Sequence, residues 1–136
     1  MLRRDFISKI IEQMVNAVAR LIKIDIENDQ EKFLENFDEF LSTYFKISDA
    51  ELEKLWEENE ERDAFLLDEK LKNQLMLLFV HGGLVYVNSN ELDKAKSCLK
   101  IIERIQNQHS DIYEFPSEES EKLGEKIEEL RNQLPL

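Results

Sequence analysis

The chain has 136 residues, which suits one domain that buries a hydrophobic core without disulfides or metals. Apolar residues make up 42% of the chain and charged residues 35%, which excludes a disordered polypeptide. The net charge of −12 argues against general nucleic-acid binding, because phosphate would be repelled, and it is compatible with a basic protein partner.

Glycine and proline are scarce, which favours long helices over turn-rich β-structure. There are three glycines and two prolines, and both prolines lie in the last 21 residues, at Pro116 and Pro135. Cys98 is the single cysteine, so no internal disulfide can form, and we expect a reducing, cytoplasmic location. Charged residues interrupt the N-terminal apolar stretch, so we expect no secretory signal. The longest uncharged apolar run, residues 75–80, is too short to span a bilayer.

Residues 1–28 are predicted to form one long helix with a wide apolar stripe. Its members recur at spacings of three and four: Phe6, Ile7, Ile10, Ile11, Met14, Val15, Val18, Leu21 and Ile22. Such a helix is usually packed between others, but it could also be a dimer interface or lie on a membrane surface. Residues 1–24 carry a charge of +3, which leaves −15 for the remainder. Glu12 lies among these apolar residues and, if buried, would need a basic partner.

Two capping boxes predict where the next two helices begin. In the first, Asn28 is followed three residues later by Glu31, and the helix after it has an apolar face of Phe33, Leu34, Phe37, Phe40, Leu41 and Tyr44. In the second, Ser48 is followed by Glu51, and the inward residues are Leu52, Leu55 and Trp56. The acidic run at residues 57–63 lacks the ligand spacing of an EF-hand, so a solvated helix end is the favoured interpretation over a cation site.

Three further helices are predicted in the second half of the chain, at residues 67–87, 90–108 and 117–134. Asn90 with Asp93 is the predicted N-cap of the fifth helix, Ser117 caps the last, and residues 109–116 form a linker. The whole is an all-α bundle of about six helices in a single domain. It comprises N-terminal helices in residues 1–66, a helical hairpin in 67–108 and a capping helix in 117–134. The last helix is highly charged on its outer face.

The hairpin resembles a tetratricopeptide repeat, a helix-turn-helix unit of 34 residues. The matching positions are Phe79, Gly83, Tyr86, Ala95 and Leu99. Glycine and alanine allow two antiparallel helices to approach closely, and the larger side chains fill the space around the crossing. The sequence departs from the repeat at Gly82, Ile102 and Asn107. One repeat cannot stabilise itself, and the sequence shows no second convincing copy, but the last helix could cap the unit as a terminal solvating helix does.

The whole chain also resembles a family of small uncharacterised bacterial proteins, a domain of unknown function with a repeat-like C-terminal half. The residues that carry this resemblance are 2–14, Leu-Arg-Arg-Asp-Phe-Ile-Ser-Lys-Ile-Ile-Glu-Gln-Met, together with residues 19–21, Ala-Arg-Leu. The resemblance implies a helical fold and supplies no site residues.

No arrangement of residues indicates catalysis, a cofactor or a metal. His81 and His109 are 28 residues apart and belong to no metal-binding motif. Cys98 and His81 lie on the two helices of the hairpin, but their spacing does not indicate a nucleophile and its base. The Gly82-Gly83 pair lies inside a helical pattern, so close helix packing explains it better than a phosphate loop.

We therefore expect a non-enzymatic module that binds a protein or peptide partner. The resemblance to a repeat hairpin, which presents its first helix to ligands, places the binding surface near His81, Tyr86 and Asn90. A homodimer assembled through the first helix and a weak membrane-surface association of that helix are the alternatives.

Overall fold

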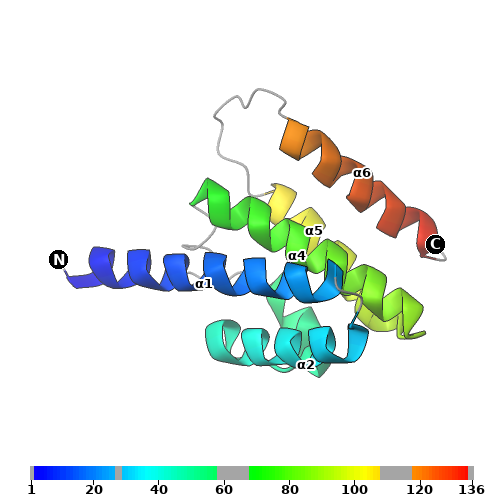
Figure 1. The fold of residues 1–136 in the computed structure, drawn as a ribbon, viewed down its shortest axis with the longest axis horizontal. Helices are drawn as coiled ribbons and strands as arrows, with labels where there is room; N and C mark the ends of the chain where they lie inside the picture. Colours follow the sequence, from blue (N-terminus) through cyan, green and yellow to red (C-terminus); the bar gives the residue numbers. More distant parts are fainter. Residues whose placement is uncertain (1, 27–28, 58–67, 108–117, 135–136) are drawn as a thin grey trace.

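The computed structural model describes residues 2–26, 29–57, 68–107 and 118–134, and these residues form an all-α bundle, as predicted (Figure 1). The helices in chain order are α1 (Leu2–Ile26), α2 (Gln30–Phe40), η1 (Leu41–Phe45), η2 (Asp49–Trp56), α4 (Glu69–Asn88), α5 (Leu92–Asn107) and α6 (Glu118–Gln133). Helix α4 lies in the middle, where it contacts α1, α2, α5 and α6. This central helix organises the hydrophobic core.

Helix α1 packs into the core between α4 and α2. Met14, Val18 and Leu21 are buried along one face, so the predicted core packing of this stripe is confirmed for them. Glu12 is exposed and therefore needs no buried basic partner. In Figure 1 the first turns of α1 extend past the ends of the other described helices.

Helix α2 begins one residue later than predicted and ends in a π-helical turn. Its N-cap is Asp29, whose carboxylate accepts a hydrogen bond of 3.1 Å from the backbone N–H of Lys32. Asn28, the predicted cap, lies outside the described residues. Phe33, Phe37 and Phe40 are buried on one face, as the apolar spacing predicts, and the π-helix η1 continues from the last of them.

The capping interaction predicted at residues 48–51 is confirmed, and it opens a 3-10 helix, η2. The Glu51 carboxylate accepts hydrogen bonds from the backbone N–H of Ser48 at 3.0 Å and from its hydroxyl at 3.2 Å. Leu52 and Leu55 are buried, as predicted. The side chain of Trp56 and most of the acidic run, residues 58–63, lie outside the part of the chain that the structure describes.

A short turn joins α4 to α5, and it corrects one predicted cap. Asn90 has a φ of 62° in the left-handed region, which asparagine tolerates better than most residues. Helix α5 then begins at Leu92, so Asn90 is a turn residue, and its prediction as the N-cap was wrong. The backbone N–H of Glu91 donates a 2.8 Å hydrogen bond to the carbonyl of Tyr86 and closes the turn.

The glycine pair in α4 allows close packing on two sides, as the sequence predicts. A Cβ atom at Gly82 would lie 3.2 Å from Cζ of Phe37, which belongs to α2. A Cβ atom at Gly83 would lie 2.7 Å from Cδ2 of Leu130 and 3.4 Å from Cβ of Cys98. Gly83 therefore makes its closest approach to α6, while the repeat pattern predicts the approach to α5.

Helix α6 covers α4 and α5 with a single aliphatic stripe. Ile127, Leu130 and Leu134 are buried, and Leu123 is half-buried beside them. Ser117, the predicted cap, and the predicted linker at 109–116 lie outside the described residues. The exposed charged residues of α6 among those described are Glu121, Lys122, Glu125, Glu128 and Glu129.

Candidate partner-binding surface

The three residues predicted to contact a partner do not share a surface. Tyr86 is fully buried, and its ring packs against Phe37 with 6.1 Å between the centroids. His81 is 7% exposed, and only Asn90 is exposed to solvent. Of the three residues, Asn90 is therefore the one that lies at the surface of the described bundle.

A polar cluster at one end of the hairpin covers Tyr86. The ammonium of Lys94 lies 5.6 Å from the ring centroid of Tyr86, 3.1 Å from the carboxylate of Asp49 and 3.2 Å from that of Glu91. The backbone N–H of Asp49 in turn donates a 2.8 Å hydrogen bond to the carboxylate of Asp38. These contacts link α2, η2 and α5, so the cluster serves to position elements.

Two buried nucleophilic groups lie beneath this cluster, and neither is activated. Burial raises the pKa of the Tyr86 phenol and also the pKa of the Cys98 thiol, so both stay protonated at neutral pH. The Tyr86 hydroxyl has no hydrogen-bond partner among the described residues. These two residues therefore form part of the packing and offer no reactive nucleophile.

The described residues contain no group of three or more histidine, cysteine or acidic side chains arranged to hold a metal ion. Within the same residues, no helix is both long enough and apolar enough to cross a bilayer.

One small apolar cavity lies where the N-terminal and C-terminal elements meet. Its volume of about 30 Å³ is far below the several hundred that a small-molecule site occupies. The residues that line it are Phe45, Leu55, Leu75, Phe79, Ile101, Arg104 and Ile105. A space of this size is a packing defect.

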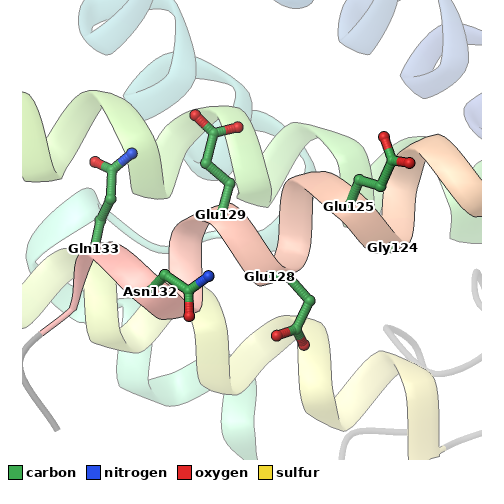
Figure 2. Close-up of a pocket in the computed structure, with 6 residues that line it drawn as sticks. All are labelled: Gly124, Glu125, Glu128, Glu129, Asn132 and Gln133. Carbon is green, nitrogen blue, oxygen red and sulfur yellow. The ribbon is translucent and has the colours of Figure 1, made fainter.

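A larger hollow, which we call the α6 trough, lies open to solvent on the outer face of α6. It is shallow, and it is lined by residues of α6 alone: Gly124, Glu125, Glu128, Glu129, Asn132 and Gln133. Figure 2 shows Glu125, Glu129 and Gln133 projecting in one row, while Glu128 projects on the other side of the helix. The rows follow from the helical spacing of four residues, which places such side chains above one another.

The α6 trough carries negative charge that the described part of the protein does not neutralise. Arg131 pairs with Glu128 and lies 3.8 Å from Glu103 of α5. Among the described residues, no basic side chain forms an ion pair with Glu125 or Glu129. Gly124 adds no side chain to this face, and the glutamates that line the α6 trough carry their carboxylates on aliphatic stems. The α6 trough can therefore accept both a cation and an apolar stem.

Sequence reasoning noted the charged outer face of the last helix without selecting any residue in it. The absence of a side chain at Gly124, one turn before Glu128, is the one signal in the sequence that marks an open position on this face. No family model matches the chain, and neither a curated protein nor a solved structure matches it.

Proposed function

We propose that this chain is a non-enzymatic helical module that binds a basic segment of a partner protein in the α6 trough. The observation that carries the proposal is the pair of glutamates, Glu125 and Glu129, which are exposed, lie one turn apart and pair with no described basic residue. Because the single cysteine suits a reducing compartment, we expect the module to act in the cytoplasm.

The binding mechanism follows from charge and shape. Lysine or arginine side chains spaced by one helical turn would lay their aliphatic stems over Gly124 and place their cations between the carboxylates. The net charge of −12 would attract such a segment from a distance and raise its association rate, most strongly at low salt. Exposed ion pairs contribute modestly, so we expect binding in the micromolar range and strong salt dependence.

We further propose that α4 and α5 form a hairpin of the tetratricopeptide type that serves as a scaffold for α6. The burial of Ala95, Leu99 and Tyr86 supports this proposal, because the repeat uses these positions for packing between its two helices. In this arrangement the hairpin holds α6 in place, and the partner binds α6 itself.

A matched pair of double variants tests the α6 trough. A fluorescein-labelled amphipathic peptide of lysines and leucines is titrated against the wild-type chain, against Glu125→Gln/Glu129→Gln and against Glu35→Gln/Glu39→Gln. The control pair on α2 is also exposed, has the same spacing and changes the net charge equally. Losing two exposed ion pairs of about 0.5–1 kcal/mol each should weaken binding to the α6 variant by about five- to thirtyfold.

Equal weakening by both double variants would mean that net charge alone attracts the peptide, and the proposal would be rejected. Affinity capture from native cells, followed by mass spectrometry, provides the physiological version of the test. A genuine partner should be retained by the wild-type chain and by the α2 control, and it should be lost from the α6 variant.

Self-association through α1 is a second candidate, and the half-buried flanks of its stripe favour it. The partly exposed apolar residues of this helix are Ile10, Ile11, Val15, Ala17, Ile22 and Ile24. A second copy of α1 could cover these residues. Sedimentation velocity at micromolar concentration should then detect a dimer, and a monomer alone would remove this candidate.

The same flanks and the charge of +3 on residues 1–24 also favour a weak membrane-surface association of α1. Flotation with vesicles rich in anionic lipid separates this candidate from self-association. Protein that stays at the bottom of the gradient would exclude it.

A further inference from the structure

Helix α6 is attached to the bundle by a narrow set of aliphatic side chains. The buried residues are Ile127, Leu130 and Leu134, which follow one another at spacings of three and four. The side chains around them, including Glu125, Glu128 and Glu129, are exposed. A helix with one aliphatic stripe and a polar remainder has the pattern of a ligand that lies in a groove between other helices.

The surface beneath this stripe is shaped around one leucine. We call it the α6 seat and define it by Gly83 of α4 and Cys98 of α5. A Cβ atom at Gly83 would lie 2.7 Å from Cδ2 and 3.0 Å from Cδ1 of Leu130. The leucine therefore occupies the space that a side chain at position 83 would fill. Gly83 and Cys98 are both buried, and a Cβ atom at Gly83 would also lie 3.4 Å from Cβ of Cys98. The α6 seat therefore selects for a leucine at its centre.

Charge adds a second requirement beside the α6 seat. Glu103 of α5 lies 3.8 Å from Arg131, the residue that follows the seated leucine. A helix in this position gains from a basic residue directly after its central leucine. The complete pattern is an aliphatic residue, a leucine three positions later, a basic residue next, and an aliphatic residue four positions after the leucine.

Helix α6 is also suited to leave the α6 seat as a unit. Three aliphatic side chains bury much less apolar surface than α4 does, where Leu71, Leu78 and Tyr86 are all fully buried. Segments held by few buried contacts open at a lower free energy than the whole domain unfolds. Opening of α6 would expose the α6 seat while the contacts of α4 with α1 and α2 remain.

We propose that the α6 seat is a binding site for an amphipathic helix of a partner protein, and that α6 is its competitor within the chain. The partner helix carries leucine and a following basic residue in the pattern given above. This second site is formed by residues of α4 and α5 and includes none of the residues of the α6 trough. The affinity measured for a partner equals its affinity for the open α6 seat multiplied by the fraction of chains in which α6 is displaced.

The test uses the chain's own helix as the probe. A fluorescein-labelled peptide of residues 118–134 is titrated, with anisotropy as the readout, against the full-length wild type and against full-length Leu130→Ala, in which α6 is held less tightly. We expect at least about tenfold tighter binding to the variant, because more of its seats are open. The same peptide with Leu130→Ala should bind neither protein.

Adding Gly83→Ala to the Leu130→Ala chain should weaken peptide binding, because the new methyl group would lie 2.7 Å from Cδ2 of the seated leucine and force that side chain to shift. Gly124→Ala is the matched control, since its added methyl group meets no atom within 4 Å, and it should leave binding unchanged. Undiminished binding to the Gly83→Ala double variant, or no binding to any chain, would overturn the proposal.

A measurement on the wild type alone covers the case in which a variant fails to fold. Amide hydrogen exchange should be at least about a hundredfold faster in α6 than in α4, as expected for separate opening of α6. Equal protection in the two helices would show that α6 opens only with the whole domain, and the proposal would fail.

Discussion

Helix α4 lies in the middle of the bundle, whereas helix α6 lies at its surface and covers α4 and α5. Between residues 70 and 88 of α4, the exposed side chains are Lys70, Asn73 and Asn88. Helix α6 instead buries one stripe and exposes its carboxylates. The distribution of apolar residues around a helix therefore decides its place in the bundle, since a helix that is apolar all round must be covered on all sides.

The glycines of these two helices differ in how closely other residues surround them. Gly83 in α4 has Leu130 and Cys98 within 3.4 Å of the position that a Cβ atom would take, while Gly124 in α6 has no atom within 4 Å of that position. The same residue type therefore serves close packing in one helix and leaves an open surface in the other. Substitutions along these two helices should differ in size and in sign.

The largest effect is expected where α2 packs on the glycines of α4. Phe37 is fully buried, stacks on Phe33 at 5.7 Å between centroids and meets Phe79 edge-on at the same distance. Phe37→Ala removes these contacts and leaves a cavity beside Gly82, so the free energy of unfolding should fall by about 3–5 kcal/mol. Urea denaturation monitored by circular dichroism measures the change.

The control is Glu35→Ala, an exposed position on the same helix, which should change stability by less than about 0.5 kcal/mol. If Phe37→Ala cost no more than this control, α2 would not be packed on α4 as the structure describes.

The next largest effect is expected for Gly83→Ala. Overpacking against Leu130 costs about 1–3 kcal/mol, and the better helix propensity of alanine returns up to about 1 kcal/mol. We therefore expect a net loss of about 1–2 kcal/mol in thermal or urea unfolding. A gain in stability would show that Leu130 has room to move and that α4 and α6 are not in close contact.

Tyr86→Phe should act in the opposite direction. The hydroxyl is buried and has no partner among the described residues, so removing it takes away a desolvated polar group while the ring contact with Phe37 remains. We expect the free energy of unfolding to rise by about 1 kcal/mol in urea titration. A fall of that size would reveal a hydrogen bond from the hydroxyl to a residue outside the described ranges.

Most of the fold was predictable because it depends on local spacing. The stripes predicted the helices and many of their buried residues, among them Val18, Phe37 and Leu130. The errors occurred at helix ends, where Asp29 replaces Asn28 as the cap and Asn90 takes a left-handed turn conformation. Several residues at each end can satisfy the same backbone groups, so the sequence alone does not choose between them.

The candidate site was harder to predict because it depends on contacts between distant segments. Tyr86 is fully buried, and one of its neighbours is Phe37, a residue of α2 that lies 49 positions earlier in the chain. The α6 trough could not be recognised from spacing, because exposed glutamates occur on almost every helix of this acidic chain. Only the packed structure reveals that Arg131 pairs with Glu128, and that no described basic side chain forms an ion pair with Glu125 or Glu129.

The smallest change in the free energy of unfolding is expected for Gly124→Ala in α6. Gly124→Ala adds a methyl group to the α6 trough where nothing lies within 4 Å, so no packing is lost. The unfolded chain has fewer backbone conformations with alanine than with glycine at this position, so it loses less entropy when the helix forms. The free energy of unfolding should therefore rise by about 0.5–1 kcal/mol. Thermal unfolding of this variant beside Gly83→Ala would give shifts of opposite sign. Shifts of the same sign would mean that α6 does not lie with Leu130 against α4 and Gly124 toward solvent, and both proposed sites would lose their geometric basis.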